Sequence, residues 1–192
     1  MANIEALERH VTDTIKEWEM KLGAINTELR LYYPAVSLEE LLGLPRECEK
    51  EKLQAALNEF CSAVRPRLGK ILVSGEERIC LTVSPEGCAY VKNLPDPPFL
   101  RDLLAIMTEP AAGLAQVQAL FEEYAKRAGS AVCEQEDQQD GIGRVFYFAD
   151  ERIDPYVYCV SQDEFGLTYH RFDRRDFAHL TDEHETDSKA FL

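Results

Sequence analysis

Near its C-terminus the sequence gathers two imidazoles and two carboxylates, side chains that can transfer protons or bind a metal ion. His170, Asp173, Asp176 and His179 follow one another at intervals of three residues. On a helix, residues three apart lie on one face, and metal ligands or a general acid–base pair need such closeness. These four residues are therefore the candidate catalytic residues of a small-molecule or metal-dependent enzyme.

The same residues also have a structural interpretation. Asp173 suits the N-cap of a short helix over residues 174–180, and Asp176 would lie at the third helical position, where an acid favours the helix dipole. His179 near the end of that helix is favourable for the same reason, and His170 lies on an expected strand. On this interpretation the cluster stabilises a helix, and we lean towards a protein that is not an enzyme.

Arginines and tyrosines near this cluster are the candidate binding residues. Clustered arginines in an acidic chain can hold a small anion or a carboxylate, and tyrosines that share an exposed face suit a protein or ligand interface. Alternatively, the arginines complement a helix end or pair with neighbouring acids, and the tyrosines pack between strands. The candidates are Arg171, Arg174, Arg175, Tyr156, Tyr158 and Tyr169.

The sequence predicts no metal site and no cofactor. With Glu136 as the first position of a calcium-binding loop, Gln138 would be the third and Tyr147 the twelfth, where a bidentate Glu is required. The six cysteines form no CxxC pair. The chain also contains no GxSxG motif and no phosphate-binding loop.

The formal net charge of the 192-residue chain is −14. A field of that sign repels phosphate, so we expect no nucleic-acid partner and no anionic membrane surface as partner. Residues 134–140 carry four acidic and no basic residues, and residues 181–192 carry four acidic and one basic residue. Solvated stretches that aid solubility are one interpretation of these segments, and a docking surface for a basic partner is the other.

The cysteines and the hydropathy pattern indicate the compartment. Most of the cysteines lie inside apolar runs, where free Cys behaves as a small hydrophobic residue. No apolar run approaches the roughly 20 residues that span a bilayer. With no signal peptide in the sequence, we expect a cytoplasmic protein that does not enter a membrane.

Hydrophobic periodicity predicts an α+β fold. Helical spacing predicts a helix over residues 4–22, a short one over 37–43, and further helices around 53–64, 100–107 and 114–124. Alternation predicts strands over residues 70–74, 78–83, 87–92, 144–148, 156–160 and 167–172, with a polar loop over 134–141. Because both faces of the first three strands look apolar, we expect antiparallel three-stranded meanders flanked and covered by helices.

The two strand-rich regions resemble each other. Each region connects its first two expected strands through the same three residues, Glu77-Arg78-Ile79 and Glu151-Arg152-Ile153, and a glycine, Gly87 or Gly166, marks the start of the third. A duplicated unit of helix, three strands and helix, with halves 46–108 and 112–180, would explain this order. We expect one domain over residues 1–180, followed by an acidic tail over 181–192.

One sequence pattern resembles a known family. The run Leu31-Tyr32-Tyr33-Pro34, followed by Ser37-Leu38 and Leu41-Leu42 after a helix that carries Trp18, resembles a bacterial family of unknown function seen mainly in Firmicutes. The resemblance implies a bacterial, intracellular protein and transfers no site residues. At the level of the fold alone, the chain also looks somewhat like bacterial secretion chaperones.

The sequence favours a non-enzymatic protein-interaction domain, with an adaptor or chaperone-like role. Its expected partners are proteins, including further copies of the chain. The alternative is the enzyme that would use the His/Asp cluster, and a concave pocket containing those four residues would favour it.

Overall fold

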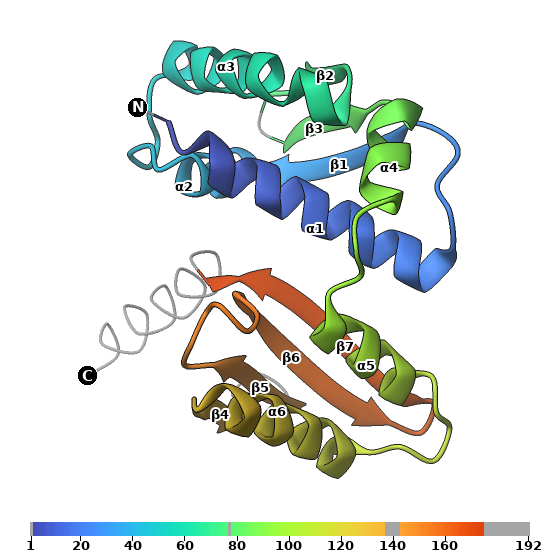
Figure 1. The fold of residues 1–192 in the computed structure, drawn as a ribbon. Coiled ribbons are helices and arrows are strands. Elements are labelled where there is room, and N and C mark those ends of the chain that lie inside the picture. Colours follow the sequence, from blue (N-terminus) through green and yellow to red (C-terminus); the bar gives the residue numbers. More distant parts are fainter. Residues whose placement is uncertain (1, 77, 137–142, 175–192) are drawn as a thin grey trace, which may run out of the picture. The chain divides into compact units, whose positions relative to one another are not determined.

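A computed structural model describes residues 2–76, 78–136 and 143–174. The fold is α+β, as predicted, with two antiparallel sheets. The chain forms two compact units, unit 1 over residues 1–96 and unit 2 over residues 97–192 (Figure 1). Compactness alone does not establish independent folding, so the single domain over residues 1–180 stays a prediction.

Unit 1 packs its helices on one face of a three-stranded sheet with the order β1-β3-β2. In Figure 1, α1 and α4 pass in front of β1 and β3. The core consists mainly of Leu, Ile and Val side chains from all the elements of the unit. These elements are α1 (Ile4–Leu22), β1 (Leu29–Pro34), α2 (Ala35–Leu41), α3 (Lys50–Leu68), β2 (Ile71–Ser74), β3 (Arg78–Val83) and α4 (Pro85–Lys92).

Helix α1 begins and ends where the sequence predicts. The Asn3 side chain accepts a hydrogen bond from the Ala6 backbone N–H at 3.2 Å, and Gly23 follows the last turn with a φ of 88°. This positive φ is a conformation that favours glycine. The apolar stripe of α1, the residues that repeat at helical spacing, is fully buried at Leu7, Val11 and Ile15, but Trp18 is 42% exposed and Leu22 77% exposed. The last turn of α1 therefore carries the stripe beyond the core of unit 1.

The strand expected over residues 87–92 is wrong, because these residues belong to helix α4. Ser84 is the N-cap and its hydroxyl accepts a hydrogen bond from the Gly87 N–H, while Pro85 occupies the first helical position. The helix buries Cys88 and Val91, one turn apart. The third strand of this sheet is instead β1, from much earlier in the chain.

Unit 2 packs two helices on one face of a four-stranded meander with the order β4-β5-β6-β7. Its core is aromatic, and the rings of Phe99, Phe121, Phe146, Phe148 and Tyr158 lie close to one another, mostly edge to face. Strand β4 occupies part of the expected polar loop over 134–141. The elements are α5 (Pro98–Met107), α6 (Leu114–Ala128), β4 (Val132–Glu136), β5 (Gly143–Phe148), β6 (Tyr156–Asp163) and β7 (Gly166–Asp173).

The two units order their elements differently. In unit 1 the strands are interspersed with the helices, with β1 between α1 and α2 and the pair β2-β3 between α3 and α4, whereas in unit 2 both described helices precede the strands. Gly87 lies inside a helix, while Gly166 begins β7, so these two glycines do not correspond structurally. The first expected repeat half, 46–108, also spans the boundary between the units at residue 96. The duplication stays a prediction.

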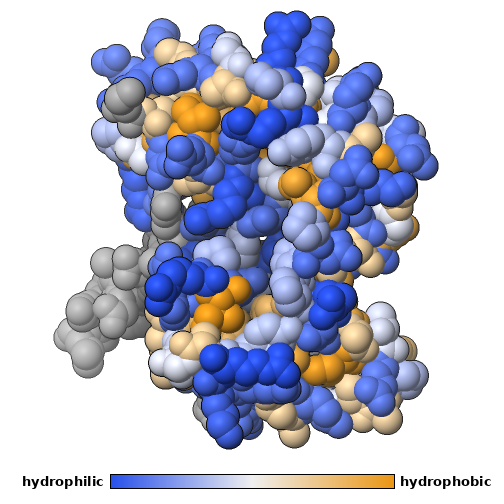
Figure 2. All heavy atoms as spheres, in the orientation of Figure 1, coloured by the Kyte–Doolittle hydropathy of each residue, from blue (hydrophilic) through white to orange (hydrophobic). Residues whose placement is uncertain are grey.

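Within the described residues, no helix has the length and apolar character needed to cross a membrane. The face of the molecule in Figure 2 is mainly hydrophilic, with small and separate hydrophobic areas. Isolated apolar residues on a surface are normal for a protein in water.

Candidate functional site

The structure describes half of the predicted catalytic cluster. His170 and Asp173 both lie on β7, whereas Asp176 and His179 lie outside the described residues. Residues three apart on a strand point to opposite faces of the sheet. His170 is exposed and Asp173 is buried, so these two side chains do not converge on a common site.

No group of three or more His, Cys, Asp or Glu side chains in the described part of the chain is arranged to hold a metal ion. The six cysteines are free. Burial raises the pKa of the Cys48, Cys61 and Cys88 thiols, so these three are protonated near neutral pH and are poor nucleophiles.

Four of the predicted binding residues do cluster on β6 and β7. The Arg171 guanidinium lies 4.2 Å from the centre of the Tyr156 ring, and the Tyr169 ring lies 5.9 Å from that of Tyr158. The Tyr158 hydroxyl donates to Asp154 Oδ2 at 3.0 Å, and Asp154 Oδ1 accepts the Tyr156 N–H at 3.0 Å.

These residues link β6 to β7 through the contacts of Tyr156 with Arg171 and of Tyr158 with Tyr169. Tyr156, Tyr158 and Asp154 are all buried. Burial, followed by the charge of Asp154, raises the pKa of Tyr158 well above its usual value, so the phenol stays protonated and remains a donor. A ligand would have to displace core side chains to reach these groups, so the geometry favours a structural role for them.

Of the remaining arginine candidates, Arg174 binds the end of β5. It donates to the Phe148 carbonyl oxygen, lies 5.2 Å from the centre of the Tyr147 ring, and pairs with Glu151 at 3.6 Å. Arg175 lies outside the described residues. The partners of Arg174 agree with the structural interpretation of the arginines.

A groove of about 380 Å³, open to solvent, runs between α6 and β4. Its lining is formed by Gln118, Glu122, Ala125, Lys126, Ser130, Val132 and Glu134. None of these seven was a sequence candidate. The sequence does contain a pattern that is typical of a short strand after a helix. Gly129 ends the helix, and the apolar pair Val132-Cys133 follows shortly after it, before charged residues.

Polar contacts fix one wall of the groove. Arg144 Nη1 donates to Glu134 Oε1 at 2.6 Å and to Gln118 Oε1 at 3.3 Å. Gln118 in turn donates to Glu122 Oε1 at 3.0 Å. These bonds connect α6 to β4 and β5. The lining contains two carboxylates, of which Glu134 is paired with Arg144 and Glu122 accepts from Gln118.

Strand β4 is an edge of the described sheet, so its backbone N–H and C=O groups point alternately towards β5 and away from it. The Ala149 N–H donates to the Ala131 carbonyl at 2.9 Å. In antiparallel pairs, hydrogen-bonded residues alternate with residues whose N–H and C=O point away. With Val132 opposite Phe148 and Glu134 opposite Phe146, the backbone groups of Val132 and Glu134 point outwards, and no described residue pairs with them.

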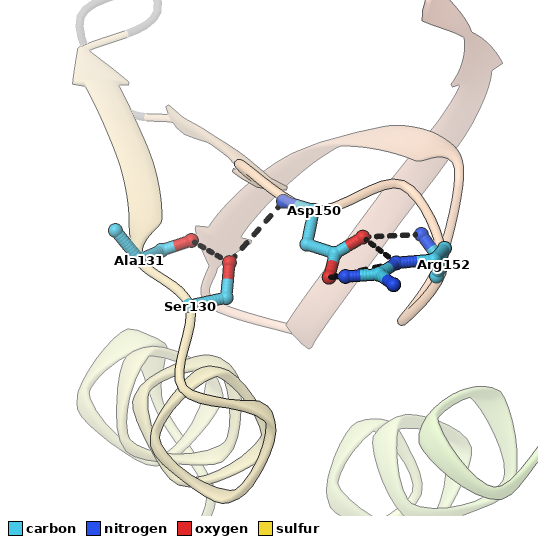
Figure 3. A network of polar contacts seen from close by, with 4 residues as sticks. All are labelled: Ser130, Ala131, Asp150 and Arg152. Carbon is cyan, nitrogen blue, oxygen red and sulfur yellow. Dashed lines mark hydrogen bonds and ion pairs between the residues drawn. The ribbon is translucent and has the colours of Figure 1, made fainter.

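The start of β4 is held by a turn network (Figure 3). The Asp150 N–H donates to Ser130 Oγ at 3.2 Å, and Ser130 Oγ donates to the Ala131 carbonyl at 3.5 Å. Hydrogen bonds from Arg152 lower the pKa of Asp150 to about 2, so this carboxylate stays ionised at physiological pH. The network therefore positions the first residues of the edge strand.

Comparison with known families agrees with the pattern at residues 31–42. The sequence model of a family described as a domain of unknown function from E. rectale, DUF3877, matches residues 4–181. The chain belongs to the DUF3877 family. This confirms the predicted bacterial family of unknown function, since E. rectale is a Firmicutes bacterium.

The DUF3877 match runs through both compact units and includes the groove between α6 and β4. No curated protein and no solved structure matches the chain. The DUF3877 description assigns no site residues.

Proposed function

We propose that this protein is a non-enzymatic interaction domain of the bacterial cytoplasm, which binds an extended, basic segment of a partner protein along β4. The observation that carries the proposal is the edge of β4, whose outward N–H and C=O groups lie beside a groove. An extended peptide added to such an edge gains main-chain hydrogen bonds, and a neighbouring groove receives its alternate side chains.

The charge of this region supports a basic segment. The lining contains the carboxylates of Glu122 and Glu134 and one cation, Lys126, and Glu134 is already paired with Arg144. Residues 134–140 add no basic side chain, and the net charge of −14 favours cationic partners at long range. Charged residues on an edge strand also discourage unspecific pairing, so they select a complementary segment over any exposed strand.

The enzyme alternative receives no support from the described residues. The two described residues of the predicted catalytic cluster, His170 and Asp173, point to opposite sides of β7. Neither lines the groove between α6 and β4. An adaptor or chaperone-like role needs no catalytic group, and it is the proposal that the open groove supports.

The test uses a dye-labelled peptide, Lys-Val-Lys-Val-Lys-Val-Lys, titrated with the full chain and followed by fluorescence anisotropy. We expect saturable binding, and we expect loss of binding when alternate peptide nitrogens are methylated, because methylation removes main-chain donors. A Glu-Val repeat of equal length should not bind, since its charge is wrong.

Two variants locate the binding. Val132→Pro removes an outward N–H that the β4–β5 ladder does not use, whereas Val132→Ala shortens the side chain and keeps that N–H. We expect Val132→Pro to bind about tenfold more weakly than Val132→Ala, the loss of roughly one hydrogen bond. Equal affinity for both variants, or for the methylated peptide, would contradict strand addition at β4.

A further inference from the structure

The sheet of unit 1 has one face that none of the described residues covers. The strand β1 alternates strictly, with Leu29, Leu31 and Tyr33 buried and the residues between them exposed. The expectation that both faces would be covered is therefore wrong for this sheet. The outer face presents Arg30, Tyr32, Pro34, Leu72, Ser74, Arg78 and Thr82, with Cys80 buried among them.

Two large side chains on this outer face are exposed to water. Tyr32 is 52% exposed and Leu72 is 48% exposed. Tyr32 lies opposite Cys80 on β3, and Leu72 lies opposite Thr82 on the same strand. The outer face therefore offers an aromatic ring and an aliphatic side chain on the strands that flank β3, which is the composition of an interface centre.

The outer face is also basic, which is unusual in a chain of net charge −14. It carries Arg30 and Arg78, and no described carboxylate pairs with either guanidinium. Arg78 lies 5.7 Å from the centre of the Tyr32 ring, a cation–π contact that leaves its donors available. By contrast, Arg46, Arg101, Arg127, Arg144 and Arg152 each pair with a carboxylate.

The strand register fixes the spacing of these two charges. Arg30 pairs with Thr82, Tyr32 with Cys80, and Pro34 with Arg78, so the arginines lie on either side of Tyr32. Pro34, which lies opposite Arg78, is four residues after Arg30, which corresponds to roughly 13 Å along a strand. An extended peptide spaces its own residues in the same way, so carboxylates four residues apart would match both guanidiniums.

We propose that the outer face of the unit 1 sheet docks an acidic, extended segment of a partner protein, with an apolar side chain midway between two carboxylates. One carboxylate pairs with Arg30 and the other with Arg78, and each carboxylate can accept two N–H hydrogen bonds from its guanidinium. The apolar side chain packs on Tyr32 and Leu72. This surface is separate from β4, and it selects the opposite charge.

Charge favours a protein segment over a nucleic acid here. A nucleic acid would bring a run of phosphates into the field of a chain of net charge −14, against two cations on the face. A short segment with two carboxylates brings only the charge that the two arginines can neutralise. A single-stranded oligonucleotide is nevertheless a useful comparison, because exposed aromatic rings also stack with bases.

The test is anisotropy titration of the full chain with dye-labelled Gly-Glu-Thr-Leu-Thr-Glu-Gly. We expect saturable binding that weakens with salt, and little binding of the same peptide with both Glu replaced by Gln. The double variant Arg30→Gln/Arg78→Gln should lose at least about tenfold in affinity, since two charge-assisted contacts are removed. Tyr32→Ala should also bind more weakly.

Arg65→Gln is the matched control, because Arg65 is exposed on α3 and is not part of the outer face. It should bind as the wild type does, and all variants should keep the wild-type circular dichroism. Binding of the basic peptide at β4 should be unchanged in the double variant, so failure of one proposal is distinguishable from failure of the other.

Three results would overturn the proposal. Unchanged affinity in the double variant would show that the arginines do not bind the acidic peptide. Tighter binding of a uridine oligonucleotide than of the peptide would make nucleic acid the occupant. Concentration-dependent dimers in sedimentation velocity that Arg30→Gln/Arg78→Gln abolishes would make a second copy of the chain the occupant.

Discussion

The ammonium group of Lys16 lies 2.8 Å from Oδ1 of Asp96, the last residue of unit 1. The same nitrogen donates to the carbonyl oxygens of Leu94 at 2.6 Å and Lys92 at 3.2 Å. Lys16 thus neutralises the C-terminal end of α4, where unpaired carbonyls favour a cation. Its side chain is only 8% exposed, so α1 is tied to the end of α4 by a buried charge.

We expect Lys16→Met to destabilise the protein by about 2–3 kcal/mol, because the carbonyls and the Asp96 carboxylate lose a charged donor. Urea denaturation followed by circular dichroism measures this change. Lys50→Met is the control, because Lys50 pairs with Glu76 where both side chains are largely exposed. A loss for Lys50→Met as large as that for Lys16→Met would contradict the assignment.

Glu19 on the same helix should make stability depend on pH. Both of its carboxylate oxygens are buried, and burial raises its pKa, although Lys16 opposes the shift. A raised pKa in the folded state means that Glu19 favours folding below its unfolded pKa and that this contribution is lost as pH rises through the folded pKa. Glu19→Gln should therefore be more stable than wild type at neutral pH.

The difference between Glu19→Gln and wild type should disappear near pH 4 or below, where about half or more of unfolded glutamates are already protonated. Free energies of unfolding at both pH values provide the comparison. A gain in the free energy of unfolding that is equal at acidic and neutral pH would show that the change of side chain itself, and not the ionisation of Glu19, determines the effect.

Tyr158→Phe should cost about 1–3 kcal/mol, because it leaves the buried Asp154 carboxylate with one donor fewer. Tyr124→Phe is a matched comparison within unit 2. The Tyr124 hydroxyl donates to Asp102 at 2.6 Å, and burial together with Asp102 raises its pKa to about 12, but the pair is only partly buried. Calorimetry should show the larger fall in melting temperature for Tyr158→Phe.

Gly87→Ala should destabilise unit 1 by about 1–3 kcal/mol, since overpacking forces neighbouring backbone to shift. A Cβ at position 87 would clash with the carbonyl oxygen of Leu68 at the end of α3. In helix interiors Gly→Ala is normally favourable, so a stabilised variant would show that α3 and α4 are not closely packed there.

The groove between α6 and β4 gives a prediction about charge. Glu122→Lys should weaken binding of the basic Lys-Val peptide several-fold, because it reverses a charge in the lining. Glu123→Lys is the control, since Glu123 is the next residue of the same helix, pairs with Arg127, and does not line the groove. Equal effects of both variants in the anisotropy titration would indicate unspecific attraction only.

Local signals predicted much of this fold. The N-cap at Asn3, the apolar spacing through Ile15 and the stop at Gly23 define α1 from sequence alone. Alternation places β3 and β7 closely. The strand prediction for residues 87–92 was wrong because Cys88, Tyr90 and Lys92 alternate with smaller residues as in a strand. The preceding Ser84-Pro85 pair, which begins a helix, is equally typical of a turn with Pro at its second position.

The candidate sites were harder to predict because they depend on tertiary pairing. His170 was correctly expected on a strand, yet the closeness of His170 to Asp173 assumed helical spacing, and one strand cannot place both on the same face. The groove between α6 and β4 is invisible in sequence, because residues 134–136 resemble a loop until pairing with β5 makes them an edge strand. Charge alone did identify the acidic segment that includes them.

The exposed end of α1 carries Trp18, whose intrinsic fluorescence can be used to follow unfolding. Trp18 is the chain's single tryptophan and lies in unit 1, so selectively excited indole emission reports on unit 1, whereas circular dichroism reports on both units. If residues 1–180 fold as one cooperative domain, the two signals must change together during unfolding. Separate midpoints would reveal two units that unfold independently, with no label and no mutation required.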